Sequence, residues 1–257
     1  MNLMVMAGTT EGVEIIAKLA QIKDIKIIAT TITRQGADLA SSAGADEVIA
    51  HALDEKEIEE LIKSRKIDVL VDATHPFAAD ATRNAIKAAY TCKIKYARFE
   101  RPSINILEND LIHQVHSFEE ATSEALKLTE GRILHLAGVM TLHRLTEKID
   151  PRRIVARVLP SVYSIGKCLE LGLPAYNIIA MQGIFSKDFN RSLMEDYDIS
   201  LVVTKESGEV GGTPSKTEAA MELGIPVVMV MRPYLHELEN KRVFNNSSEL
   251  IRYLSLL

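Results

Sequence analysis

A polar turn near the start of the chain, Ala7-Gly8-Thr9-Thr10-Glu11-Gly12, has residue types that bind phosphate. It follows an apolar run and precedes a segment with helical spacing, so we expect it at a helix N-terminus. Unpaired N–H groups and the helix dipole favour an anion there, and a glycine lets the backbone approach the ligand. Thr9 and Thr10 add hydroxyl donors. Because Thr10 replaces the middle glycine of G-x-G-x-x-G, a glycine turn with a threonine cap and no ligand explains the string equally well.

A second polar loop, Thr30-Thr31-Ile32-Thr33-Arg34-Gln35, follows the next apolar run. A dinucleotide-binding fold places the adenosine ribose here, where an acidic residue favours NAD and an arginine favours the 2′-phosphate of NADP. The loop contains Thr31, Thr33 and Arg34 but no acid, which favours NADPH over NADH. The alternative is an arginine that only contacts solvent.

The string Asp72-Ala73-Thr74-His75-Pro76-Phe77-Ala78 ends the fourth apolar run, where a nicotinamide ring and its reaction partner would meet. His75 is a candidate acid–base group because histidine titrates near neutral pH. The alternative is structural, with Asp72 and Thr74 capping the next helix and Pro76 at its first position. We predict Asp72, Thr74 and His75 as catalytic residues.

Several loops in the second half of the chain carry cations or glycines directly after apolar runs. They are Gln182–Ser186, Thr204–Gly208, Gly211–Lys216 and Met231–Pro233. The carboxyl ends of parallel strands share one edge of a sheet, so Lys205, Lys216 and Arg232 could converge on an anionic ligand. No zinc site, nucleophile elbow or catalytic triad is predicted.

Short Val- and Ile-rich runs alternate with amphipathic segments along the whole chain, which indicates parallel sheets joined by helices. The expected strands are Leu3–Ala7, Ile25–Thr31, Glu47–His51, Val69–Asp72, Ile94–Arg98, Ile133–Ala137, Ile154–Val158, Tyr176–Ala180, Leu201–Thr204 and Val227–Met231. A polar stretch between them sets a boundary near residues 99 to 110. We predict an α/β protein with two Rossmann-like domains, residues 1–99 and 100–257, and a ligand cleft between the domains.

Composition limits the partners. The 257 residues carry a formal net charge of -5, which disfavours general binding to nucleic acid or to an anionic membrane. No apolar run reaches the roughly 18 residues of a membrane span. Cys92 and Cys168 lack metal-site or CxxC spacing. We expect a cytoplasmic protein without a metal.

Taken together, these strings resemble the precorrin-6A / cobalt-precorrin-6A reductase family over nearly the whole chain. The matching strings are Gly8–Glu11, Asp72–Ala78, Arg98 with Glu100–Pro102, Gln182–Ser186, Val203–Gly208, Lys216 with Ala219-Ala220, and Arg232-Pro233. Two details depart from the family pattern: Ile184 stands where proline is common, and the loop after the second strand lacks the Ser-x-Ala-Gly-Arg form.

The resemblance implies an oxidoreductase of cobalamin (corrin) biosynthesis that uses NADPH to reduce one C=C bond of precorrin-6A or its cobalt complex. The tetrapyrrole substrate has many carboxylates, and other enzymes of the corrin pathway are expected partners. The implied cofactor residues are Gly8, Thr9, Thr10, Glu11, Thr31, Thr33 and Arg34. The implied substrate residues are Arg101, Gln182, Lys205, Ser207, Gly208, Lys216 and Arg232.

Two hypotheses from other functional classes remain. One is a module that senses NAD(P) without turnover, and the other is a doubly wound transferase that uses a nucleotide-sugar or adenosylmethionine. Thermal shifts with NADPH, NADH, adenosylmethionine and nucleotide-sugars distinguish them, because a ligand stabilises the fold that binds it.

Overall fold

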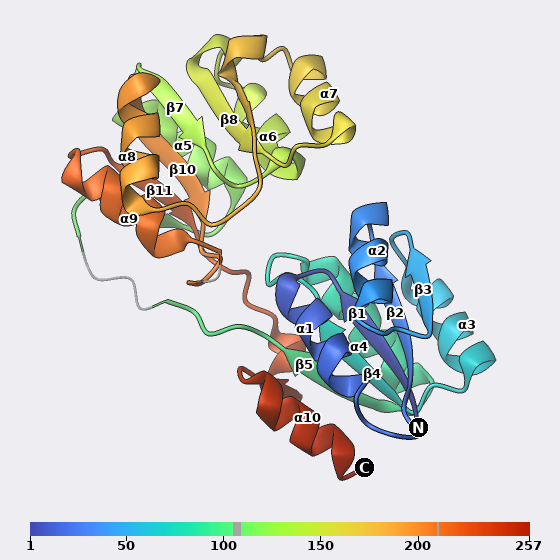
Figure 1. The fold of residues 1–257 in the computed structure, drawn as a ribbon. Coiled ribbons are helices and arrows are strands. Elements are labelled where there is room, and N and C mark those ends of the chain that lie inside the picture. Colours follow the sequence, from blue (N-terminus) through green and yellow to red (C-terminus); the bar gives the residue numbers. More distant parts are fainter. Residues whose placement is uncertain (105–108, 210) are drawn as a thin grey trace. The chain divides into compact units, whose positions relative to one another are not determined.

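The computed structural model describes residues 1–104, 109–209 and 211–257. The chain forms two compact units (Figure 1). Unit 1 contains Met1–Pro102 and Pro233–Leu257, and unit 2 contains Ser103–Arg232. Each unit has one six-stranded sheet in which every strand pair is parallel. The predicted α/β class with parallel, Rossmann-like sheets is therefore confirmed.

Unit 1 has the strand order β12-β5-β4-β1-β2-β3. Its strands are β1 (Asn2–Ala7), β2 (Lys26–Thr31), β3 (Glu47–Ala50), β4 (Val69–Ala73), β5 (Lys95–Phe99) and β12 (Arg242–Phe244). Its helices are α1 (Thr10–Leu19), α2 (Arg34–Ser42), α3 (Glu55–Arg65), α4 (Ala79–Thr91) and α10 (Ser247–Ser255), with a short 3-10 turn at His236–Leu238.

The sheet of unit 1 is covered on both faces, as buried parallel strands require. Alternate residues of β1 point to opposite faces. Leu3 and Val5 pack in one apolar cluster with α1, α2 and α10, while Met4 and Met6 pack in another with α3 and α4. This accounts for the continuous apolar strand sequences.

Unit 2 has the order β6-β11-β10-β7-β8-β9. Its strands are β6 (Ile112–Val115), β7 (Arg132–His135), β8 (Ile154–Val158), β9 (Ile178–Ala180), β10 (Ile199–Lys205) and β11 (Val227–Val230). Its helices are α5 (Phe118–Leu128), α6 (Val139–Thr146), α7 (Val162–Glu170), α8 (Lys187–Asp196) and α9 (Thr213–Glu222), with 3-10 turns at Pro151–Arg153 and Ala175–Asn177.

The division into units differs from the expected 1–99 and 100–257, because the C-terminal segment belongs to unit 1. There β12 pairs with β5, and α10 buries Leu250 and Leu254 in the unit 1 core. With only three residues, β12 is too short to show an apolar pattern that would identify it as a strand from the sequence. Part of the predicted boundary, residues 105–108, lies outside the described residues.

Both sheets reverse their strand order, between β1 and β4 in unit 1 and between β7 and β10 in unit 2. Ligands of open α/β sheets bind outside the carboxyl ends of strands at such a reversal. Three of the predicted loops, after β1, β4 and β10, start at these points. Among the helices described, not one combines the length and the apolar character needed to cross a membrane.

Candidate active site

The turn after β1 is built as the N-terminus of α1. Thr9 is the N-cap: its hydroxyl accepts a hydrogen bond from Gly12 N (3.1 Å) and donates one to Ala73 O (3.2 Å). Both hydroxyl functions of Thr9 are thus used inside the protein, so Thr9 shapes the turn. Thr10 and Gly8 are exposed, and the first amides of a helix lack intrahelical partners. These amides are the groups that the turn offers to an anion.

Close packing around this turn involves two glycines. A Cβ on Gly12 would lie 3.0 Å from Ala7 Cα, so glycine lets α1 pack closely against β1. The glycine that serves helix–strand packing in dinucleotide turns has the same function. A Cβ on Gly8 would lie 3.5 Å from Thr74 Cα, so the loops after β1 and β4 are neighbours. The sequence motif contained Gly12, but its packing role was not predicted.

Glu11 and Arg101 form an ion pair at the same turn. Arg101 Nε lies 3.3 Å from Glu11 Oε1, and the two side chains are only 10% and 12% exposed. Arg101 was expected to bind a substrate carboxylate. In this structure its guanidinium contacts the carboxylate of Glu11 in the predicted cofactor turn.

The loop after β2 presents the residues predicted to lie near the ribose. Thr33 caps α2 by accepting a hydrogen bond from Gly36 N (3.0 Å), and Thr31 donates to Thr33 O (3.2 Å). Arg34 is exposed at the first position of α2, and Ile32 is 71% exposed beside it. The loop therefore offers one cation and one apolar side chain at a helix N-terminus.

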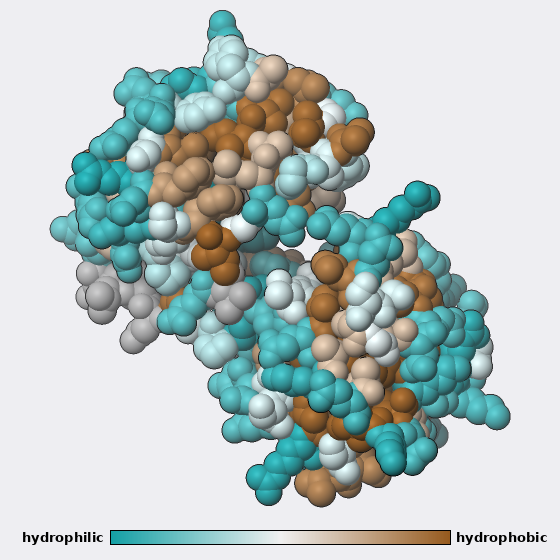
Figure 2. All heavy atoms as spheres, in the orientation of Figure 1, coloured by the Kyte–Doolittle hydropathy of each residue, from teal (hydrophilic) through white to brown (hydrophobic). Residues whose placement is uncertain are grey.

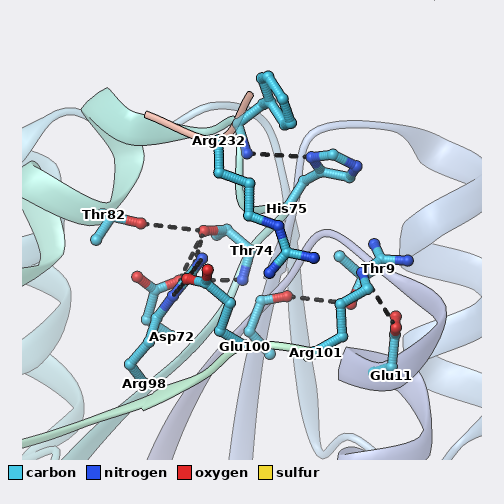
Figure 3. A network of polar contacts seen from close by, with 12 residues as sticks. Thr9, Glu11, Asp72, Thr74, His75, Thr82, Arg98, Glu100, Arg101 and Arg232 are labelled. Carbon is cyan, nitrogen blue, oxygen red and sulfur yellow. Dashed lines mark hydrogen bonds and ion pairs between the residues drawn. The ribbon is translucent and has the colours of Figure 1, made fainter. Parts of the chain in front are cut away.

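A buried polar network lies at the end of β4 (Figure 3). The β4–β5 register places Asp72 opposite Arg98, and both side chains are at most 1% exposed. Asp72 Oδ1 accepts hydrogen bonds from Arg98 Nη1 (2.7 Å), Thr74 Oγ1 (2.7 Å) and Thr74 N (3.0 Å). Tyr96 donates its hydroxyl to Asp72 Oδ2 (2.9 Å), and Glu100 accepts from Arg98 Nη2 (3.2 Å).

This network changes the role expected for Asp72. A fully buried carboxylate saturated by three side chains cannot touch a ligand at the surface, so Asp72 is a positioning residue for Thr74. Burial, and secondly the charge of Asp72, raise the pKa of Tyr96 well above its ordinary value, so Tyr96 remains a neutral donor. Tyr96 and Arg98 are polar residues in a strand that is buried on both faces. That position is the sequence feature that could have identified them as part of the network.

His75 lies beside this network in the same loop and is half-buried. Its Nδ1 accepts the N–H of Phe77 (3.2 Å), and the two rings are 5.8 Å apart. With Nδ1 as the acceptor, the neutral ring carries its hydrogen on Nε2. His75 is thus arranged to donate a hydrogen bond through Nε2.

In unit 2, Glu206 is a second buried carboxylate with an arginine partner. Glu206 is 1% exposed and forms an ion pair with Arg232, whose Nη2 lies 3.3 Å from Glu206 Oε1. Glu206 also accepts hydrogen bonds from Gly208 N (2.9 Å) and Ile104 N (3.3 Å). The charge of Arg232, expected to bind substrate, is therefore compensated by a carboxylate that sequence reasoning missed.

The neighbouring loop residues are held in place internally. Ser207 is buried, and its N–H donates to Thr213 Oγ1 (3.2 Å). Gly208 has a φ of +73°, which favours glycine. Ser207 and Gly208 thus fix the loop after β10, and Gln182 lies exposed after β9 at the same sheet edge.

Three cations, Lys216, Lys205 and Arg157, are close enough to interact electrostatically in unit 2. Burial, Arg157 and Lys205 together lower the pKa of Lys216 to about 7. Lys216 Nζ donates to Gly211 O (2.8 Å), and its side chain is buried. Burial lowers the pKa of Arg157 to about 10. Arg157, a charged residue within an apolar strand run, was not predicted. A polyanion that meets this cluster would restore the charge on Lys216.

Apolar side chains lie near the same edge of the unit 2 sheet. Met140 follows β7, Leu159 follows β8, and Val162, which begins α7, is 92% exposed. Figure 2 shows apolar surface over the region of α6 and α7. The carboxyl edge of unit 2 therefore combines one buried and two half-buried cations with an exposed apolar surface.

Comparison with known proteins identifies the family. The sequence model of the family "Precorrin-6x reductase CbiJ/CobK" matches residues 2–255. The chain belongs to this family. Cobalt-precorrin-6A reductase of Methanothermobacter thermautotrophicus is 44% identical over 256 residues, covering 99% of this chain and 83% of the relative. The enzyme of the same name from Methanocaldococcus jannaschii is 39% identical and covers 100% of this chain and 99% of the relative.

A solved structure supports the fold of this precorrin-6x reductase family member. The CobK precorrin-6A reductase structure superimposes with a TM-score of 0.79 at 20% identity, covering 99% of this chain and 96% of that one. The predicted family resemblance is confirmed, and with it an oxidoreductase whose family implies a nicotinamide cofactor. The close α1–β1 packing at Gly12 and the Thr9-capped helix N-terminus fit such a dinucleotide.

Proposed function

We propose that this protein catalyses the NADPH-dependent reduction of one C=C bond of cobalt-precorrin-6A, giving cobalt-precorrin-6B in cobalamin biosynthesis. The observation that carries the proposal is the match over the whole chain to two relatives named cobalt-precorrin-6A reductase. Metal-free precorrin-6A is the competing substrate, and its turnover tests the choice of the cobalt form.

Unit 1 would hold the cofactor at the carboxyl ends of its strands. The N-terminal amides of α1, ordered by the Thr9 cap, would bind the pyrophosphate. Arg34 would contact the 2′-phosphate of NADPH, and Thr31 and Thr33 shape that loop. The absence of an acid between Thr31 and Gln35 supports NADPH over NADH, because a carboxylate there would repel the extra phosphate.

The loop after β4 would orient the reacting groups. When bound, the nicotinamide supplies a hydride to one carbon of the C=C bond, and the other carbon receives a proton. Asp72 and Arg98 hold Thr74 rigidly from below, and His75 offers Nε2–H as a hydrogen-bond donor. Rigid placement matters because hydride transfer depends on close contact between two carbons. A His75→Ala variant with unchanged turnover would remove His75 from this role.

Unit 2 would bind the macrocycle. Lys205, Lys216 and Arg157 supply positive charge for the ring carboxylates, since charge-assisted hydrogen bonds to carboxylates are the strong ones. Met140, Leu159 and Val162 supply apolar surface for the ring itself. The mildly acidic chain thus has a local cationic site for an anionic substrate.

The decisive test is an anaerobic assay with purified enzyme, NADPH or NADH, and either cobalt-precorrin-6A or precorrin-6A. We expect nicotinamide oxidation and a product heavier by two hydrogens, fastest with NADPH and the cobalt substrate. Tight NADPH binding without turnover of either substrate would refute the reductase proposal and favour a sensing module. A Lys216→Met variant should raise the KM for the macrocycle and leave the Kd of NADPH unchanged.

A further inference from the structure

Unit 1 has a pocket near the amino-terminal ends of its strands, whereas the candidate active site lies at their carboxyl ends. The pocket has a volume of about 470 Å³, within the range of small-ligand sites. Its walls come from the end of α4, the start of β5, residues 240–242 and Tyr253 of α10. The start of β5 lies at the amino edge of the parallel sheet, whereas Thr74 and His75 follow the carboxyl end of β4. The pocket is therefore separate from the predicted cofactor turn.

The charges that line this pocket all have the same sign. Lys93, Lys95, Lys241 and Arg242 contribute four cations, and no lining residue is acidic. Within the part of the chain that the structure describes, none of the four forms an ion pair. A concave site lined by one sign of charge concentrates the field and attracts counter-ions. In a protein with net charge -5, this local excess favours an anion.

Aromatic rings stand among these cations. Tyr90 is 80% exposed, and the Arg242 guanidinium lies 4.6 Å from the centre of the Tyr253 ring. Ile86 and Ala89 add apolar wall. Stacking on tyrosine binds flat aromatic rings, and Lys and Arg bind phosphate groups. The two features together match a ligand with an aromatic ring and several negative charges.

We propose that this pocket is a second, non-catalytic site for a nucleoside polyphosphate. The base would lie against the exposed ring of Tyr90, and the phosphates would contact Lys93, Lys95, Lys241 and Arg242. The ligand would connect α4 and β5 to the C-terminal segment, which are about 150 residues apart in the sequence. Tyr96 also lines the pocket while its hydroxyl holds Asp72, so one wall of the site belongs to the network under Thr74.

The test uses the full chain, saturated with NADPH to block the cofactor turn, and measures binding of ATP without magnesium by titration calorimetry. Adenosine has the ring without the charge, and tripolyphosphate has the charge without the ring. We expect ATP to bind at least about 10-fold more tightly than either, and to bind more weakly as salt rises. Amide exchange of residues 240–246 should slow when ATP binds.

Matched variants locate the site. Lys95→Glu/Lys241→Glu should weaken ATP binding at least about 10-fold and retain turnover with NADPH. Lys23→Glu/Lys56→Glu makes the same charge change at exposed lysines elsewhere on unit 1 and should leave ATP binding unchanged. Undetectable ATP binding, or equal loss in both double variants, would overturn the proposal. Adenosine or tripolyphosphate binding as tightly as ATP would overturn the assignment to a nucleoside polyphosphate.

Discussion

Replacing Asp72 by asparagine should destabilise unit 1 strongly, because the change removes the negative charge that compensates the buried Arg98 guanidinium. Both side chains are at most 1% exposed, and their closest atoms are 2.7 Å apart. Removing one member of a buried ion pair typically costs about 3–5 kcal/mol. Glu100 still accepts from Arg98 Nη2 at 3.2 Å, so we expect the lower end, about 3 kcal/mol.

Amide hydrogen exchange measures this change in each unit separately, which matters because two units need not unfold together. Amides of β4 and β5 should lose about 3 kcal/mol of protection, while amides of β7 and β10 serve as an internal control. Asp68→Asn is the matched variant, since Asp68 accepts one exposed hydrogen bond from Asn2 N (2.7 Å). It should cost no more than about 1.5 kcal/mol.

A double-mutant cycle with Arg98→Met separates the ion pair from other effects of Asp72. The double variant should be less destabilised than the sum of the single variants, because it no longer contains a buried guanidinium without its Asp72 charge. An Asp72→Asn loss below about 1 kcal/mol in β4 and β5, or additive single variants, would refute the assignment of Asp72 as the partner of a buried charge.

Three further predictions concern the cofactor turn, the ribose loop and the cationic cluster. Thr9→Ala removes the α1 cap and should destabilise unit 1 by about 0.5–2 kcal/mol in thermal unfolding, whereas Thr9→Ser should cost less. Arg34→Ala should lower the ratio of kcat/KM for NADPH to that for NADH by roughly 10-fold, because one charged contact is lost; an unchanged ratio would exclude Arg34 from the 2′-phosphate site. The folded pKa of Lys216, about 7, is below its ordinary 10.5, so the buried lysine destabilises unit 2 fully below pH 7, and this penalty disappears as the pH rises to about 10.5. Lys216→Met removes this penalty at pH 6 but also loses the hydrogen bond to Gly211 O, which is worth roughly 1 kcal/mol. The net stabilisation of unit 2, measured by urea unfolding, should therefore be about 4 kcal/mol at pH 6 and much less at pH 10.

The sequence was informative about the strands because burial on both faces demands continuous apolar runs. The predicted runs Val69–Asp72 and Ile154–Val158 correspond to β4 and β8. The apolar pattern did not predict β12, because Val243 and Phe244 are its only apolar residues. This segment is a strand because it pairs with β5. That pairing joins distant parts of the chain, so no local signal indicates it.

The candidate site was predictable as a set of loops, because parallel strands end at a common edge. The roles within the loops were not. Asp72 and Arg98 become partners through the β4–β5 register, and Glu206 and Arg232 become partners across the unit 2 sheet edge. Each carboxylate is identifiable in sequence, but its burial depends on partners from another strand. Chemical type and spacing therefore predicted which loops share a sheet edge better than which side chains pair within them.

The separation of unit 1 into two stretches of sequence has a consequence for folding. Unit 2 is one continuous stretch, Ser103–Arg232, so its sheet can form without either part of unit 1. The nascent N-terminal stretch must wait for β12 and for the apolar face of α10, which carries Leu250 and Leu254. Until then its β5 edge and part of its core are exposed, and such edges invite aggregation. Unit 1 is thus the half of the protein more exposed to aggregation while it folds, because the whole of unit 2 separates its two stretches in the sequence.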